Sequence, residues 1–255
     1  MKPQQLAPSL PPWRQQASIL ADRYLAVMLG DFPTLLLLIA QAPVIAFLCA
    51  IVWGDIEQDT KSLYFVLSLT AVWFGCINAC REIVKERSIF ERERLFGLSP
   101  PAYVISKARV LAALNVVQVA LLLGIVEWKV GLKGSLWLQA AALVLCATAG
   151  TGLGLLISAL SRRQERAVAA VPLLILPQIL FSEFAIPREH FGKLTAAVEN
   201  VMIVRWCYRV FVEAAETEPG YLMIILSLTI LVLMAVALHA LSTAALAVSS
   251  GEDFL

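Results

Sequence analysis

Apolar runs of about 20 residues, repeated along nearly the whole chain, are the feature that most limits how this sequence can fold. Twenty residues are roughly what a helix needs to cross a bilayer. Of the 255 residues, 60% are hydrophobic and only 15% are charged, with a mean hydropathy of +0.79, whereas a soluble domain carries about a quarter charged residues. The sequence therefore predicts an all-α, polytopic membrane protein.

Six apolar runs are long enough to be read as transmembrane helices. Prolines at positions 172 and 177 interrupt the fifth of them; neighbouring helices can satisfy the carbonyls that such prolines free, and the helix usually kinks there. The expected spans are Pro33–Trp53, Leu63–Ile83, Tyr103–Val126, Leu136–Leu160, Ala167–Ala185 and Tyr221–Val248.

The Lys and Arg residues between the spans predict the orientation. Thirteen fall on the side that holds both termini, and seven fall on the other side. Because cytoplasmic loops carry the excess of basic residues, both termini are expected in the cytoplasm, with the protein in a bacterial inner membrane.

Two segments outside the spans have an amphipathic pattern. Trp13–Gly30 is expected to lie along the inner membrane surface. The alternative is a disordered tail. Together with a short cytoplasmic tail, this helix forms the first unit of the chain, residues 1–31. Glu189–Ala215 is expected to form short helices on the outer face, within the six-helix unit of residues 32–255.

A densely charged block, Arg81–Lys107, follows the second span. Its acidic and basic residues alternate and nearly cancel, whereas a segment that binds anionic lipid would be plainly basic. Apolar residues at 89, 90, 95, 96 and 98 accompany these charges. Mixed-sign surfaces give register to protein docking, so the block is interpreted as a docking helix. The alternative is a solvated helix end held by i, i+4 ion pairs.

Several kinds of chemistry are absent from the sequence. It contains no GxxxxGK[ST] phosphate loop and no HExxH, CxxC or GxSxG motif. Its two histidines, His190 and His239, are far apart and indicate no metal site. The net charge of +1 says nothing further about partners, and no nucleic-acid partner is expected. The spans hold no paired acidic residues, which argues against a proton- or sodium-coupled transporter, and an enzyme acting alone is disfavoured.

The order of these elements resembles the transmembrane domain of the ABCG-type (white-family) ABC exporters. The resemblance covers Trp13 to the end of the sixth span and is strongest in the runs REIVKER (81–87), FERER (90–94) and Ser99–Lys107. It implies a connecting helix at Trp13–Gly30 and a coupling helix at Glu86–Leu98 that seats on an ATP-binding subunit. The residues expected to couple to that ATPase are Glu86, Arg87, Phe90, Glu91, Arg92, Glu93, Arg94, Leu95 and Phe96.

The resemblance also implies a dimer of two copies around a central cavity, with ATP and Mg²⁺ held by the partner subunit and no cofactor in this chain. Half-transporters of that family carry an ATP-binding domain before the membrane domain, and this sequence has none. Either the ATPase is a separate subunit, which the Met1 start favours, or the sequence is part of a longer chain.

Some polar and small residues within the spans are candidates for particular roles. Phe74 and Asn78 are candidates for the substrate cavity, with helix packing and interhelical hydrogen bonding as the alternatives. Glu183 is a candidate for an outer gate, or else an interfacial acid in water. The Gly150-x-x-x-Gly154 pattern predicts close packing within the chain. Interhelical hydrogen bonds are expected from Gln41, Asn115, Gln118 and Gln178.

The function that these features favour is the permease subunit of an ATP-driven ABC exporter, working as a homodimer on a lipophilic or amphipathic substrate. The alternatives are a membrane scaffold that binds a partner through the charged block, and a secondary transporter.

Overall fold

The structure of the protein is a computed structural model that describes residues 11–54, 61–183 and 192–249, and the regular elements in these ranges are all helices. The predicted all-α class is confirmed. The longer helices of the bundle are α2 (Phe32–Trp53), α3 (Lys61–Ala79), α5 (Pro100–Val130), α6 (Leu136–Leu160), α7 (Gln164–Leu180) and α10 (Tyr221–Ser249). The remaining elements are α1 (Trp13–Gly30), the 3₁₀ turn η1 (Val84–Glu86), α4 (Arg87–Leu95), α8 (Lys193–Glu199) and α9 (Ile203–Ala215).

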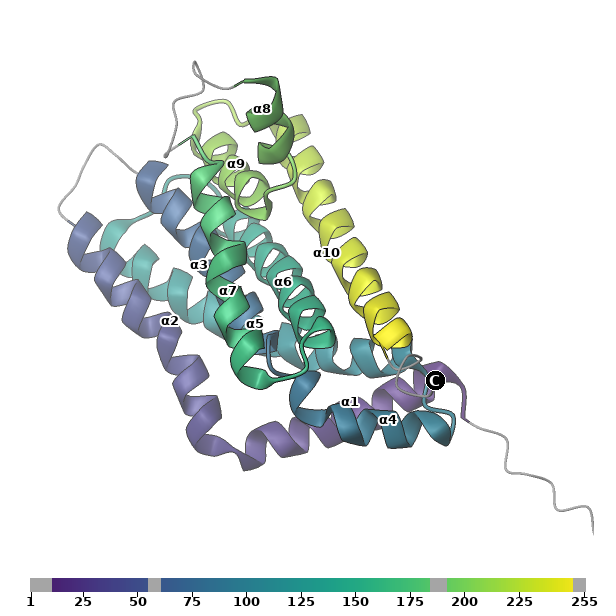
Figure 1. The fold of residues 1–255 in the computed structure, drawn as a ribbon. Coiled ribbons are helices and arrows are strands. Elements are labelled where there is room, and N and C mark those ends of the chain that lie inside the picture. Colours follow the sequence, from purple (N-terminus) through teal and green to yellow (C-terminus); the bar gives the residue numbers. More distant parts are fainter. Residues whose placement is uncertain (1–10, 55–60, 184–191, 250–255) are drawn as a thin grey trace, which may run out of the picture.

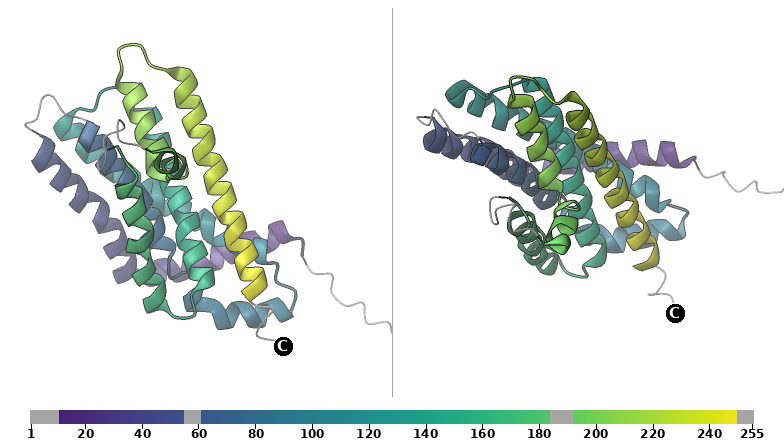
Figure 2. Two further views of the ribbon diagram at one scale, coloured as in Figure 1. Left: turned by 45° about the horizontal axis from the view of Figure 1, so that its top comes forward. Right: turned by 90° about the horizontal axis from the view of Figure 1, so that it is seen from above.

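The helices α2, α3, α5, α6, α7 and α10 form a bundle, and different helices lie at its two ends. Helices α1 and α4 lie across one end, and α8 and α9 lie at the other (Figure 1). Seen from above, α1 extends sideways beyond the bundle (Figure 2). Helix α6 is central and packs against α3, α5, α7, α9 and α10. The bundle thus separates the two amphipathic segments that the sequence predicted.

Five stretches of the described chain are long and apolar enough to cross a membrane. Four of them are the helices α2, α5, α6 and α10, and the fifth is the segment that begins with α3. The fifth predicted span corresponds to α7, which has 17 residues and continues through Pro172 and Pro177. A helix of 17 residues is about 26 Å long, less than the roughly 30 Å of a bilayer's hydrocarbon core. Six spans therefore stay a prediction, and the last predicted residues of the fifth, 184 and 185, lie outside the described ranges.

Glycines bring the backbone of α6 close to two neighbours, against the backbone of α3 and against side chains of α10. A Cβ atom built on Gly150 would lie 2.5 Å from the carbonyl oxygen of Val72 in α3, and one on Gly154 would meet Cys76 in the same helix. On the other side of α6, a Cβ on Gly152 would lie 2.7 Å from the Cβ of Leu238 in α10. Only glycine permits so close an approach. The predicted packing of the GxxxG pattern within the chain is confirmed.

Within the charged block, a glycine ends α4 and a proline begins α5. Helix α4 ends in a Schellman motif, in which the N–H of Leu98 donates to the Glu93 carbonyl and the N–H of Gly97 to the Arg94 carbonyl. Gly97 has a φ of +92°, a conformation that glycine adopts without strain. Pro100 then occupies the first position of α5, where its fixed φ suits a helix start.

Candidate functional site

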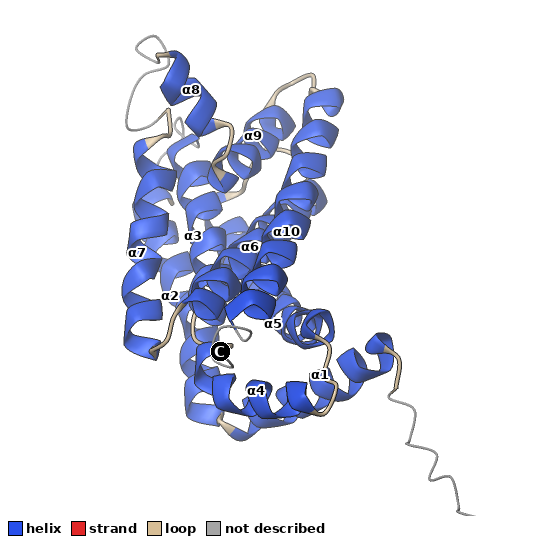
Figure 3. Cartoon of the chain, turned by 45° about the vertical axis from the view of Figure 1, so that its right-hand side comes forward, coloured by secondary structure: helices blue, strands red, loops and turns tan. Residues whose placement is uncertain are grey.

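The site is the end of the bundle where α4 and α1 meet α5, α6 and α10 (Figure 3). It begins at the turn after α3. The hydroxyl of Ser158, buried on α6, accepts hydrogen bonds from the backbone N–H groups of Ile83 and Val84, both at 2.9 Å. Because these two N–H groups bond to a side chain of another helix, α3 stops at Ala79 and not at Ile83, where the predicted span ended. The chain then turns through η1 into α4.

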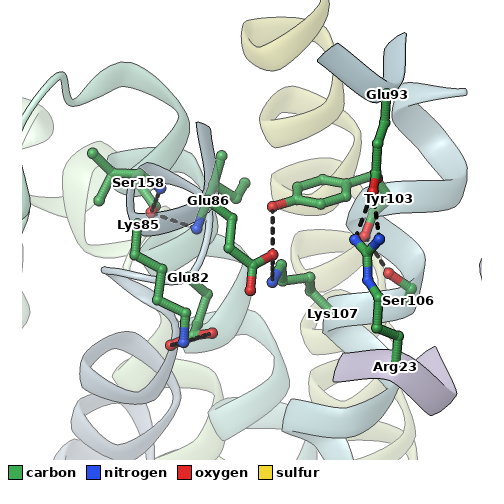
Figure 4. A network of polar contacts seen from close by, with 11 residues as sticks. Arg23, Glu82, Lys85, Glu86, Glu93, Tyr103, Ser106, Lys107 and Ser158 are labelled. Atoms are coloured by element: carbon green, nitrogen blue, oxygen red, sulfur yellow. Dashed lines mark hydrogen bonds and ion pairs between the residues drawn. The ribbon is translucent and has the colours of Figure 1, made fainter. Parts of the chain in front are cut away.

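A buried ion pair fixes the start of α4 to α5. The Nζ atom of Lys107 lies 2.6 Å from Oε2 of Glu86, and the hydroxyl of Tyr103 donates to the same oxygen at 3.2 Å (Figure 4). The Lys107 side chain is only 2% exposed. Its ammonium also lies 4.0 Å from the ring centroid of Tyr24 in α1. Three elements therefore meet at one lysine.

The surroundings of Tyr24 in α1 shift the pKa of its phenol. Burial raises the pKa of the Tyr24 phenol above its usual value, and the nearby carboxylate of Glu82 raises it further. The ring therefore stays neutral at physiological pH and meets the Lys107 ammonium through a cation–π contact.

Helix α4 is also held along its length. The guanidinium of Arg87 donates to the carbonyl oxygens of Ala159 and Ser161 at the end of α6, at 3.2 and 3.0 Å. Near its other end, Arg94 donates to the carbonyl of Ala247 in α10 at 3.0 Å. Since these carbonyls lie at helix C-termini, the arginines also meet the negative ends of two helix dipoles.

The middle of α4 contacts α5 and α1. The ring of Phe90, fully buried, lies 4.7 Å from that of Tyr103. Arg23 of α1 contacts both carboxylate oxygens of Glu93, at 2.5 and 3.3 Å. This hydrogen-bonded pair raises the pKa of the Arg23 guanidinium. The side of α4 that faces the bundle is thus occupied by contacts with other helices of the same chain.

The opposite side of α4 is open. Phe96 is 82% exposed and Leu95 66%, and Ile89 and Arg92 are exposed as well. These four residues, called the α4 outer face below, recur at helical spacing. Beside Phe96 a shallow groove of about 240 Å³ runs between α4 and α1.

The predicted coupling residues therefore divide into two groups. Glu91 pairs with Arg87 within α4 at 3.2 Å, and Glu86, Phe90, Glu93 and Arg94 contact other helices of the same chain as described above. Only Arg92, Leu95 and Phe96 of the predicted set point away from the protein. The alternation of charge in the block arises mainly from pairing inside the protein.

The other candidate residues lie apart from this end or deeper in the bundle. Phe74 is fully buried in the core, and Asn78 is 3% exposed and bonded to α5. Glu183 borders a cavity of about 140 Å³ between α3, α7 and α9 at the far end. Their predicted cavity and gate roles stay predictions. His190 lies outside the described residues.

The expected interhelical hydrogen bonds are present with one exception. Asn115 bonds to Asn78 and Thr151, Gln118 bonds to Asn78, and Gln178 accepts from the N–H of Val204 in α9. Gln41 instead donates to the Leu38 carbonyl within its own helix, so the prediction for Gln41 was wrong: that carbonyl, three residues away, is within reach of its side chain.

Sequence reasoning missed the residues that fasten the site. Lys107, Tyr103, Tyr24 and Arg23 were counted as charges or apolar positions and given no role. A signal was available for Lys107: a lysine inside an apolar helix is costly and needs a partner. Nothing in the sequence indicated that the partner is Glu86.

The described residues define an all-helical integral membrane protein with a charged helix fastened across one end. Residues 15–215 match the family described as ABC-2 type transporter, and the chain belongs to that family. Over 143 residues it is 33% identical to the ABC transporter ATP-binding/permease protein Rv1747 of Mycobacterium tuberculosis. The aligned part covers 52% of this chain and 16% of that relative.

Proposed function

We propose that this chain is the permease subunit of an ATP-driven ABC exporter and that the α4 outer face docks on a separate ATP-binding subunit. Membership of the ABC-2 type family supports a role as a transporter membrane component. The relative from Mycobacterium tuberculosis is named as both ATP-binding and permease protein, which supports a pairing of this kind of domain with an ATPase. ATP and Mg²⁺ would bind to that partner.

The observation that carries the proposal is the division of α4 into a fastened side and an open side. Aromatic residues and Arg are enriched at protein interfaces, and burying the Phe96 ring alone would contribute about 2 kcal/mol. A helix that only ended a span in water would gain nothing from presenting Phe96. The apolar surface and Arg92 favour an apolar cleft with an acidic residue on the partner.

The contacts on the fastened side of α4 support a role for this helix in passing movement of the ATPase to the membrane helices. Any displacement of α4 acts directly on α5 through Glu86, on α6 through Arg87 and on α10 through Arg94. Two copies of the chain would then form the transport path, with α4 of each copy on its own ATPase and both termini in the cytoplasm. The substrate would be lipophilic or amphipathic and leave by alternating access.

Purification of the protein from its own host tests the docking surface. The wild type is expected to bring down an ABC ATP-binding subunit, identified by mass spectrometry, with ATPase activity in the complex. Arg92→Glu and Phe96→Ala should each reduce the bound subunit at least tenfold. The controls are Lys129→Glu and Trp137→Ala, exposed residues at the other end of the bundle, which should leave binding unchanged.

Two results would overturn this proposal. If no ATP-binding subunit accompanies the wild type, the exporter assignment fails. If the subunit binds and its ATPase activity never responds to any lipophilic compound or to reconstitution in lipid, the chain is a scaffold, which is the alternative that the charged block also allowed.

A further inference from the structure

A small crevice lies where the bend between α1 and α2 faces the ends of α3 and α5. It has a volume of about 50 Å³. Its polar lining includes Asp31, Asn78, Glu82 and Lys85, and its apolar lining includes Leu35 and Leu38 of α2. The crevice is separate from the α4 outer face.

Asn78 presents its carbonyl oxygen away from α5, and the surrounding hydrogen bonds fix this orientation. Gln118 donates through Nε2 to the Leu38 carbonyl at 2.7 Å, so its Oε1 atom is the acceptor that faces Asn78. Thr151 donates to the Ala147 carbonyl and therefore accepts from Asn115, whose Oδ1 also faces Asn78. Both neighbours thus require the NH₂ group of Asn78.

The Oδ1 atom of Asn78 is consequently buried without a hydrogen-bond partner within the described part of the chain. A buried acceptor of this kind costs about 1–3 kcal/mol unless something donates to it. Asn78 is only 3% exposed and lines the crevice, so we expect a donor to approach its Oδ1 atom from the crevice.

The charges around the crevice define the donor further. Glu82 is paired with Lys85 at 2.7 Å, which leaves Asp31 as the excess negative charge. Asp31 accepts a long hydrogen bond of 3.4 Å from the Thr34 N–H and keeps acceptor capacity. The lining thus offers carboxylate and amide oxygens and an excess of one negative charge.

We propose that this crevice binds a primary ammonium group. Such a group supplies three N–H donors and one positive charge, which match Asn78, Asp31 and Glu82. Apolar Leu35 and Leu38 continue from the crevice along α2, a helix long and apolar enough to cross the membrane. The group accordingly belongs to the head of a membrane amphiphile whose tail lies along α2. The assignment does not depend on an ATPase partner.

The test compares two lipids whose ammonium groups differ: that of phosphatidylethanolamine carries three N–H donors, and that of phosphatidylcholine carries three methyl groups instead. The full chain is reconstituted in nanodiscs with phosphatidylethanolamine or with phosphatidylcholine of the same acyl chains, and the melting temperature is measured in each. We expect phosphatidylethanolamine to raise the melting temperature by several degrees relative to phosphatidylcholine. A third arm adds free ethanolamine to phosphatidylcholine nanodiscs and shows whether a soluble amine suffices without a tail.

Two variants localise the effect. Asp31→Asn removes the charge and keeps a residue that can cap α2, so the difference between the lipids should disappear. Asp22→Asn removes an equal charge from an exposed position on α1 and should preserve the difference. Equal melting temperatures in the two lipids, with no effect of ethanolamine, would show that the crevice holds water only. A preference that survives Asp31→Asn would place the ammonium elsewhere.

Discussion

The Nζ atom of Lys107 lies 2.6 Å from Oε2 of Glu86, and this pair joins α5 to the start of α4 from inside the protein. The two partners are unequally buried: the lysine side chain is 2% exposed and the glutamate 18%. Removing Glu86 and removing Lys107 should therefore destabilise the protein by different amounts.

Glu86→Gln should destabilise the protein by about 3 kcal/mol, because it leaves the more buried charge, Lys107, without a counter-ion. Lys107→Met should cost less, since Glu86 stays partly hydrated and keeps its hydrogen bond from Tyr103. Denaturation in detergent measures both. The double variant should be more stable than Glu86→Gln alone. Equal losses for the two single variants would show that the unequal burial does not govern the energy of the pair.

Gly150→Ala should destabilise the protein by about 2 kcal/mol or more, because the new methyl group would force α3 away from α6. The control is Gly124→Ala in α5, where nothing lies within 4 Å of the added Cβ. That change should be neutral or stabilise by up to about 1 kcal/mol through helix propensity. Thermal unfolding of the two variants checks the sign difference. A Gly150→Ala protein as stable as the wild type would contradict the backbone contact.

Ser158→Ala should cost about 2 kcal/mol, because the buried N–H groups of Ile83 and Val84 would lose their common acceptor. Hydrogen exchange of these two amides should accelerate. Ser161→Ala is a suitable control, because Arg87 uses only the backbone carbonyl at that position. If amide exchange at 83 and 84 is unchanged in Ser158→Ala, the hydroxyl does not hold the turn.

Glu93→Arg should loosen α1 from α4, because it places two guanidinium groups against one another at Arg23. Both side chains are about a third or more exposed, so the change in global stability should stay below about 1 kcal/mol. The sensitive measurement is hydrogen exchange in α1. Arg23→Glu combined with Glu93→Arg should restore protection, whereas protection that is unaffected by the single variant would show that the Arg23–Glu93 pair does not hold α1.

The sequence predicted the helices well where a single periodic pattern determines them. Trp13–Gly30 and Leu136–Leu160 were predicted with the bounds that the structure has. The end of α3 was placed four residues too late, since it depends on Ser158, 75 residues beyond Ile83. Apolar character alone continues past the true end of the helix.

The charged block could be located from the sequence, but the exposed side of its helix α4 could not. Near-neutrality was read as a mixed-sign surface for a partner, and the structure uses most of those charges internally. The partners of Arg87, Glu93 and Arg94 lie on α6, α1 and α10, so only the fold assigns them. A charge count cannot distinguish a pair formed within the chain from one offered to another protein.

The backbone contact of α3 with the glycine positions of α6 has a mechanical consequence. Where two backbones touch, no side-chain rotamer can absorb a relative shift, so α3 and α6 should move as one rigid pair. Flexing within a subunit should then take place between this pair and the other helices. Any hinge in the molecule should accordingly lie beside the α3–α6 pair and not between its two helices.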